Sequence, residues 1–222
     1  MKTDKQFFAQ FNSVQHFKRG EIIIRAGDEP SGVYYLKKGF VRLYLISIDG
    51  KETTYNIYKP GTYFSLIWAI SDTPNIYFFE SLTGVEVLKA PKNQVVKFFK
   101  SRPDILCDLI KRTLIGLDGT IKLTQALLMG AASQKIASAI LVLTRRFGEK
   151  KKNGEIVIQL TITHKIVASM CNLSREKTSY ELMKLKKEKI ITTINKYIVV
   201  KSVKKLEEKS PIPEIEKYTF IL

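Results

Sequence analysis

Residues 160–189 read LTITHKIVASMCNLSREKTSYELMKLKKEK. This stretch predicts two short helices with a break at residues 171–173. Thr163 and Ser174 can cap the two helices, because a side-chain oxygen there accepts a backbone N–H that has no helical partner. Asn172 lies at the break and tolerates the left-handed backbone that a sharp turn often needs. Apolar residues recur at helical spacing on one face of each helix, so the stretch is predicted to be a helix–turn–helix.

The second of these helices begins with Ser-Arg-Glu-Lys at residues 174–177 and continues with several lysines. Arginine can donate two hydrogen bonds to guanine, and glutamate can accept one from cytosine. A helix that begins with this pair is suited to the DNA major groove. Residues 131–210 hold 18 lysines and arginines, seven glutamates and no aspartate, a net charge of +11. We therefore expect this half of the chain to bind double-stranded DNA; the alternative is the same fold used only for protein contact.

The whole chain has 222 residues and a net charge of +16, which favours a polyanionic partner. It contains no apolar run of the length that spans a membrane, and its first ten residues lack the apolar segment of a signal peptide. Cys107 and Cys171 have no metal-ligand spacing and are interpreted as two reduced thiols. We expect a cytoplasmic protein that does not contact a membrane.

Short β-rich runs separated by turn residues extend from residue 17 to about residue 89. They include EIIIRA, VYYLKK, FVRLYLISI and TTYNIY. Asp49-Gly50, between the last two runs, is the clearest hairpin signal. Strands at spacings near ten residues indicate an all-β barrel, roll or sandwich. A short amphipathic helix is predicted before them, with three aromatic residues on one side: Phe7, Phe8 and Phe11.

Residues 103–129 are predicted to form one long helix, because apolar residues recur along it at helical spacing. A helix of roughly 25 residues spans about 37 Å, which is more than one small β domain covers. We expect it to pair with the same helix of a second copy; the alternative is a helix that lies wholly on its own domain. Residues 129–133 are the best hinge candidate, and Ser133 is predicted to cap the helix that follows.

The segments around the helix–turn–helix complete a second domain. A strand is predicted at residues 156–162, directly before the first helix, and GEKKKNGE before it is predicted to be a solvated loop. IITTINKYIVV predicts a strand–turn–strand around Asn195-Lys196, which has the form of a wing. Residues 201–209 predict a short helix, and residues 210–222 an extension.

The order of β-roll, long helix, hinge and winged helix–turn–helix resembles the CRP/FNR (cyclic-AMP receptor protein) superfamily of bacterial transcription regulators. FKRGEIIIRAGDEPSGVYYLKKGFVRLYLIS and KPGTYF carry the resemblance in the first half, and QLTITHKIVASMCNLSREKTSYELMKLKKEKII carries it in the second. The resemblance implies an α+β fold without enzyme activity. It also implies a homodimer on a pseudo-palindromic operator, with RNA polymerase as a further partner. The implied domains are a cyclic-nucleotide-binding-like jelly roll (1–102), a dimerisation helix (103–130), a winged helix–turn–helix (131–209) and the extension (210–222).

The family's recognition helix typically reads S-R-E-T-x-S-R, which aligns with residues 174–180. Tyr180 departs from this pattern, because the usual second base-reading arginine is absent. A tyrosine can contact a thymine methyl group or a phosphate, but it cannot make the two-hydrogen-bond contact with guanine. The operator should therefore differ from the familiar TGTGA-type half-site. The resemblance implies eight DNA-contacting residues: Thr163, His164, Ser174, Arg175, Glu176, Lys177, Ser179 and Tyr180.

The expected effector site departs from the family pattern more strongly than the recognition helix does. Members that bind cyclic AMP carry a Glu for the ribose and an Arg-Ser pair for the phosphate. Here Leu66 replaces the Glu, and Asn75-Ile76 stands in place of Arg-Ser. An uncompensated buried phosphate charge is costly, so we expect no cyclic-nucleotide binding in the usual mode. No cysteine precedes Cys107 to hold an iron–sulfur cluster, and His16 is the one histidine before the hinge, so we expect neither a metal nor another cofactor.

Aromatic and apolar residues dominate the region where a ligand would lie. One interpretation is a site for a small apolar or aromatic effector between the roll and the long helix. The other is that these side chains fill the pocket as core and the protein binds DNA without a ligand. The candidate pocket comprises Tyr63, Phe64, Ser65, Trp68, Tyr77, Thr120 and Ile121. For the whole chain, the alternative function is a β-roll ligand-binding module that acts through a protein partner.

Overall fold

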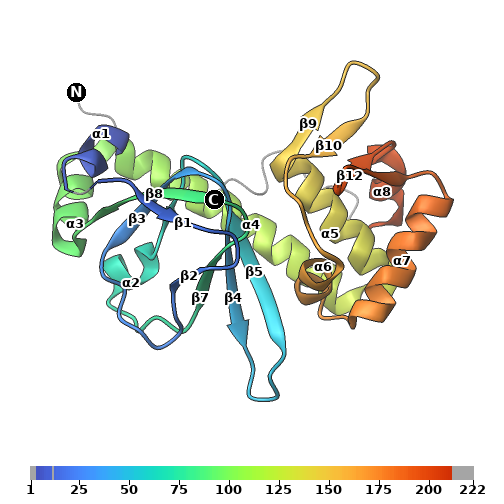
Figure 1. Cartoon of the computed structure of the whole chain (residues 1–222), viewed down its shortest axis with the longest axis horizontal. Helices are drawn as coiled ribbons and strands as arrows, with labels where there is room; N and C mark the ends of the chain where they lie inside the picture. The colour runs from blue at the N-terminus through green and yellow to red at the C-terminus, as the bar shows by residue number, and fades with distance from the viewer. Residues whose placement is uncertain (1–3, 12, 212–222) are drawn as a thin grey trace. The chain divides into compact units, whose positions relative to one another are not determined.

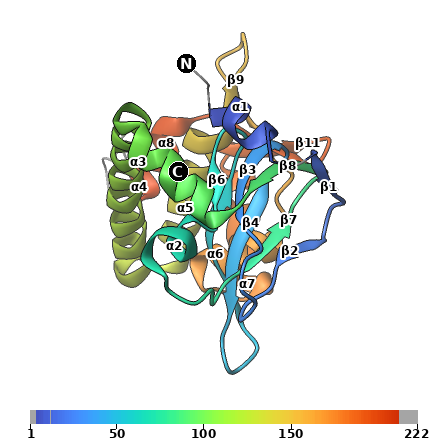
Figure 2. The same ribbon diagram turned by 90° about the vertical axis from the view of Figure 1, so that its left-hand side faces the viewer.

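The chain folds into two compact units, Met1–Leu109 and Ile110–Leu222 (Figure 1). The computed structural model describes residues 4–11 and 13–211. Helix α4 (Pro103–Met129) is continuous through the boundary between the units (Figure 2). Of the predicted extension at residues 210–222, all but the first two residues lie outside the described part.

Two antiparallel sheets of four strands each form the body of the first unit. Their strand orders are β1-β8-β3-β6 and β2-β7-β4-β5. The predicted hairpin at Asp49-Gly50 joins β4 to β5, with Val41 opposite Tyr58. The prediction of a β-roll is confirmed. The strands are β1 (Gln15–Phe17), β2 (Ile22–Ile24), β3 (Val33–Lys38), β4 (Val41–Ile46), β5 (Glu52–Tyr58), β6 (Tyr63–Phe64), β7 (Phe78–Ser81) and β8 (Val85–Ala90).

A first apolar cluster lies between the two sheets. Every second residue of a strand points to the same face, so Val41 and Leu43 of β4 face inward together. They meet residues of β3, β7 and β8 and the ring of Phe64 from β6. The members are Ile24, Tyr34, Leu36, Val41, Leu43, Phe64, Phe79, Val85 and Val87.

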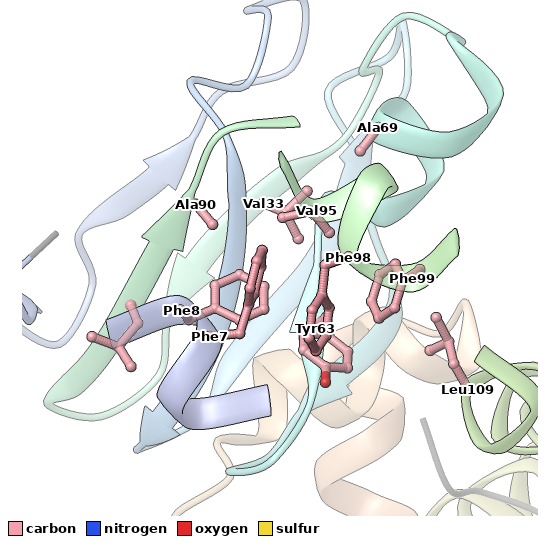
Figure 3. Close-up of a cluster of buried hydrophobic side chains, with 11 residues drawn as sticks. Phe7, Phe8, Val33, Tyr63, Ala69, Ala90, Val95, Phe98, Phe99 and Leu109 are labelled. Carbon is pink, nitrogen blue, oxygen red and sulfur yellow. The ribbon is translucent and has the colours of Figure 1, made fainter. Parts of the chain in front are cut away.

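A second cluster joins the other face of the first sheet to the helices (Figure 3). Helix α1 (Asp4–Ala9) supplies Phe7 and Phe8, and helix α3 (Lys92–Ser101) supplies Phe98 and Phe99. The rings of Phe7 and Phe98 stack with centroids 4.0 Å apart. The predicted amphipathic helix at the start of the chain therefore belongs to the roll. Large aromatic surfaces make such a cluster a main source of stability.

A short helix, α2 (Leu66–Ser71), was not expected from the sequence. Both residues that flank it have left-handed backbones, with φ of 64° at Ser65 and 55° at Asp72. Six residues are too few to show a 3.6-residue period, and the side chain of Ser65 makes no capping hydrogen bond. The hydrophobic pattern therefore gave no signal for it.

Helix α5 (Ala132–Phe147) is the central element of the second unit, and ten of its residues are buried. The predicted cap at Ser133 is wrong. The cap lies two residues earlier, at Ala131, and the side chain of Gln134 reaches back to accept the backbone N–H of Ala131 at 2.8 Å. In a capping box, a glutamine three residues into the helix accepts the N–H of the capping residue itself, whereas a serine at the cap would accept an N–H further into the helix.

A third sheet, with the order β11-β12-β10-β9, packs in the same unit. Its strands are β9 (Gly148–Lys150), β10 (Ile156–Ile158), β11 (Ile191–Ile194) and β12 (Tyr197–Val200). The predicted wing is β11 and β12, with Ile194 opposite Tyr197 at its tip. Strand β9 replaces part of the predicted loop: its three residues are all exposed, so no alternation of apolar and polar residues marks it. Helices α6 (His164–Cys171), α7 (Arg175–Lys187) and α8 (Val203–Lys209) complete the unit.

Candidate nucleic-acid interface and sensor region

The helix–turn–helix is formed by local features of its sequence, namely one capping residue for each helix and a left-handed residue at the turn. Thr163 Oγ1 accepts the backbone N–H of Ile166 at 3.2 Å, and Ser174 Oγ accepts that of Lys177 at 3.1 Å. Asn172 ends α6 in the left-handed conformation, with φ of 53°. Each hydroxyl group keeps its proton free to donate, because the cap uses the oxygen only as an acceptor. Thr163 and Ser174 can thus serve as caps and donate to a phosphate at once.

Helix α7 buries one side and exposes the other. Thr178, Leu182 and Leu185 face the core of the domain. The exposed residues near its start form what we call the reading face: Ser174, Arg175, Glu176, Lys177 and Tyr180. Within residues 13–211, Arg175 and Glu176 form no hydrogen bond or ion pair with another side chain. The two groups best suited to base edges are therefore held on a capped, rigid helix and are available to a partner.

His164 and Ser179 lie between the two helices instead of on the open surface. His164 Nδ1 is 2.7 Å from Ser179 Oγ, and both residues are half-buried. Partial burial lowers the pKa of His164, and the nearby charges of Lys186 and Arg175 lower it further. A neutral imidazole at neutral pH is consistent with a hydrogen bond that fixes the second helix against the first.

Glu181 is a member of this region that the sequence did not single out. Its side chain is 4% exposed, and its two carboxylate oxygens lie 3.2 Å from Lys177 Nζ and 3.6 Å from Lys184 Nζ. The same two ammonium groups lie 5.4 Å and 4.5 Å from the centre of the Tyr180 ring. Charged residues at helical spacing are usually a solvated face, and only the burial of this carboxylate distinguishes it.

The sensor residues do not gather around one space. Tyr63 and Phe64 are consecutive on β6 and point to opposite faces of the sheet. Tyr63 belongs to the cluster with the helices, where Trp68 also packs. Phe64 belongs to the cluster between the sheets, where Tyr77 packs. Ser65 is buried, and its hydroxyl group donates to the carbonyl oxygen of Gly32 at 2.8 Å.

The remaining two candidate pocket residues lie on α4. Thr120 and Ile121 are both exposed, and Thr120 Oγ1 donates to the carbonyl oxygen of Gly116 at 2.9 Å. They belong to the second unit, whereas the five roll residues belong to the first. The candidate pocket residues are thus divided among the two apolar clusters of the roll, a buried hydrogen bond and an exposed helix face.

The positions that hold the nucleotide in cyclic-AMP-binding members make structural contacts in this protein. Leu66 packs on the cluster with the helices. The Asn75 amide donates to the carbonyl oxygens of Arg25 and Tyr77, at 2.8 Å and 3.0 Å. Its amide oxygen accepts the backbone N–H of Tyr77 at 3.2 Å. Asn75 therefore fixes the loop between α2 and β7, and it brings no positive charge.

A buried arginine does lie in the roll, but its charge is compensated. Arg42 alternates with Val41 and Leu43 along β4, so it points away from the cluster between the sheets. Its guanidinium group lies 2.9 Å from Glu52 Oε2 and 3.2 Å from Glu80 Oε2, and its Nε donates to Thr54 at 2.7 Å. Two carboxylates on one guanidinium group leave this cation unsuited to hold a ligand phosphate.

Comparison with known proteins finds a matching family for the β-roll and another for the helix–turn–helix domain. The family described as "Cyclic nucleotide-binding domain" matches residues 14–102, and the family described as "Crp-like helix-turn-helix domain" matches residues 134–209. A global nitrogen regulator of Nostoc is 28% identical over 193 residues, 84% of each chain. The transcriptional regulator SdrP of Thermus thermophilus is 25% identical over 201 residues, 90% of this chain and 95% of that one.

A solved structure supports the same fold over most of the chain. It is a transcriptional regulator of the CRP/FNR family from Thermus thermophilus, with a TM-score of 0.71 and 24% identity, and the match covers 91% of this chain and 100% of that one. A β-roll of the cyclic-nucleotide-binding type followed by a Crp-like helix–turn–helix defines a class of DNA-binding transcription regulators. The two family matches and the named regulators among its relatives support a CRP/FNR-type regulator, as the sequence predicts. Within residues 4–11 and 13–211, no helix is both long and apolar enough to cross a membrane.

Proposed function

We propose that the protein is a homodimeric, one-component transcription regulator that binds a pseudo-palindromic operator. The reading face of α7 is the observation that carries the proposal, because its Arg175 and Glu176 stand on a capped helix and pair with no other side chain of residues 13–211. Thr163, Ser174 and Lys177 would contact phosphates, which position the helix in the groove. His164 and Ser179 would act chiefly by fixing α7 against α6. We place this function in the cytoplasm and assign no enzyme activity to the chain.

The second copy is supported by an exposed stripe on α4. Its members recur at alternating intervals of three and four residues, the spacing of paired helices. Ile110, Leu114, Leu117, Ile121 and Leu128 are each 49% to 79% exposed, and the opposite side of the helix, at Ala126, is fully buried. Exposed aliphatic residues in such a row favour association. We call this set the apolar stripe: Cys107, Ile110, Leu114, Leu117, Ile121, Thr124 and Leu128.

Cys107 offers a direct test of the pairing. It is exposed and lies on the apolar stripe, so two parallel copies would bring it close to the partner's Cys107, within the reach of a disulfide. Mild oxidation should convert the wild-type protein to a covalent dimer on a non-reducing gel, and Cys107→Ser should abolish the product. Cys171 is an internal control, because burial raises the pKa of its thiol to about 12. Failure of Cys107 to cross-link would contradict the parallel pairing.

The DNA-binding proposal is tested by selection from a pool of random duplexes. A homodimer with one recognition helix per copy should recover a two-fold symmetric consensus, with half-sites about one helical turn apart. Because Tyr180 replaces an arginine, the half-site should differ from TGTGA. Recovery of no symmetric consensus would overturn the proposal of a specific regulator. It would favour the alternative of a ligand-binding module that acts through a protein partner.

We propose that cyclic nucleotides are not the signal. Leu66 and Asn75 supply neither the carboxylate nor the cation of the usual site, and Arg42 is already paired with two glutamates. Isothermal calorimetry with cyclic AMP and cyclic GMP should show no binding heat, and micromolar affinity for either would contradict this. A small apolar or aromatic effector is the remaining candidate in the roll. Mass spectrometry of molecules released from the purified protein would identify it, and RNA polymerase is the proposed partner for activation.

A further inference from the structure

Four side chains on one ridge of α7 form a connected group. Lys177, Tyr180, Glu181 and Lys184 follow at intervals that place them together on one side of a helix. Glu181 uses one carboxylate oxygen for each lysine, at 3.2 Å and 3.6 Å. The two ammonium groups also face the Tyr180 ring, within the range of a cation–π contact. The ring thus lies close to two cations that share one anion.

The position of Glu181 makes these contacts firmer than ordinary surface pairs. Exposed ion pairs contribute little, because solvent competes and two flexible side chains must be ordered. Here the glutamate side chain is 4% exposed, while those of Lys177 and Lys184 are 49% and 46% exposed. The anion is therefore fixed at the edge of the core, and each lysine reaches from the surface toward it.

This arrangement has an unfavourable side for a DNA-binding helix. A buried carboxylate beside the major groove repels phosphate, and it occupies two lysines that could otherwise neutralise phosphates on any sequence. Neutralisation of phosphates supplies essentially all non-specific DNA affinity. Contacts with base edges supply the discrimination, and Tyr180 is the uncharged member of the group on the reading face.

We propose that Glu181 is a positioning residue that sets the sequence discrimination of this protein. It holds Lys177 and Lys184 around Tyr180, which fixes the ring toward the bases and limits the contacts of both lysines with phosphate. Non-specific affinity is thereby reduced and the ratio of specific to non-specific binding is raised. This inference rests on the proposed DNA-binding function of α7 and adds to it the residue that restrains the lysines.

The test compares Glu181→Gln with Glu188→Gln. Glu188 lies at the end of the same helix, is exposed, and pairs with Lys209 at 2.8 Å, so the control makes the same charge change away from Tyr180. Affinity for the duplex recovered by selection and for a scrambled duplex is measured over a range of salt concentrations. With Glu181→Gln, we expect affinity for the scrambled duplex to rise about tenfold and the dependence on salt to steepen by roughly one to two phosphate contacts.

The discrimination ratio decides between this role and a simple charge effect. Glu181→Gln should lower the ratio of the two affinities about tenfold, whereas Glu188→Gln should leave it unchanged. Adding Lys177→Gln and Lys184→Gln to Glu181→Gln should remove the gain in non-specific affinity. Equal behaviour of the two glutamate variants, or a ratio unaltered by Glu181→Gln, would overturn the proposal.

A second measurement covers the case in which Glu181→Gln does not fold, which a circular-dichroism melt would reveal. The double variant Lys177→Gln/Lys184→Gln keeps the glutamate. If the lysines are restrained as proposed, the double variant should reduce the salt dependence by less than one phosphate contact, and a reduction by two would overturn the proposal. If the wild-type protein does not distinguish the two duplexes at all, the proposed specific regulator fails, and that outcome is separate from the failure of the Glu181 role.

Discussion

Helices α4 and α7 expose opposite chemistries. Along α4, five of the seven exposed residues of the apolar stripe are aliphatic, with leucines at 114 and 117 more than half exposed. Along α7, the exposed residues of the reading face are polar and charged. Each helix buries its other side in its own chain. An aliphatic face is complementary to another aliphatic face, and a cationic face to phosphate, so the two helices are suited to different partners: a second copy and DNA.

The largest effect should come from placing charge on the apolar stripe. Leu114→Lys with Leu117→Lys would bring like charges together in the paired helices, at a cost of about 3–5 kcal/mol, and should convert the dimer to monomer. Sedimentation equilibrium measures this directly. Gln125→Lys is the matched control, because residue 125 is exposed on the same helix outside the stripe. A stable dimer in the double variant would show that α4 is not the interface.

A smaller and more selective effect is expected on the reading face. Glu176→Ala should relax the preference at one base position by about 1–3 kcal/mol, because the side chain that accepts from cytosine is removed. Competition with duplexes that differ at single positions measures the change. Loss of affinity that is equal for all sequences would assign Glu176 to the backbone instead of the bases.

Lys177 should behave differently from its neighbour. Lys177→Ala is expected to weaken binding to all sequences alike, and by less than one full phosphate contact, because Glu181 already pairs with this lysine. Lys204→Ala, which removes an exposed lysine from α8, is the control for charge alone. An affinity and a salt dependence unchanged from the wild type would contradict a phosphate role.

The smallest effect concerns pH and the contact between α6 and α7. The pKa of His164 is lower in the folded protein than in the unfolded chain, so the unfolded chain takes up a proton first as pH falls. The stability that the neutral ring contributes is complete above its ordinary pKa of about 6.5 and is lost as pH falls below it. Thermal melts of wild type and His164→Gln between pH 7.5 and 5 should converge at the acidic end. Parallel curves would show that the His164–Ser179 contact does not depend on this proton.

Local sequence rules predicted most of the DNA-binding half. Thr163, Ser174 and Asn172 act through hydrogen bonds and backbone angles within a few residues, so their roles are visible in the sequence. The hairpin at Asp49-Gly50 and the wing at Asn195-Lys196 are local in the same way. Strand β9 and helix α2 were missed because both are too short to show a period.

For the sensor half, the sequence predicted the β-roll but not the positions of the candidate pocket residues. Tyr63 and Phe64 are neighbours on a strand, and neighbouring side chains of a strand point to opposite faces of the sheet. The sequence alone could therefore have predicted that these two side chains do not line one pocket. The burial of Glu181 and the pairing of Arg42 with Glu52 and Glu80 depend on tertiary packing, and charge spacing alone does not show either. The family resemblance predicted the domain order. The burial and the partners of single side chains became visible only in the structure.

Native mass spectrometry of the protein with its selected duplex tests directly whether two chains bind one operator. We expect two chains on one duplex for the wild type, through one reading face per half-site. For Leu114→Lys/Leu117→Lys we expect one weakly bound chain per half-site. One chain per symmetric duplex in the wild type, or a dimer that binds no duplex, would contradict a homodimeric regulator.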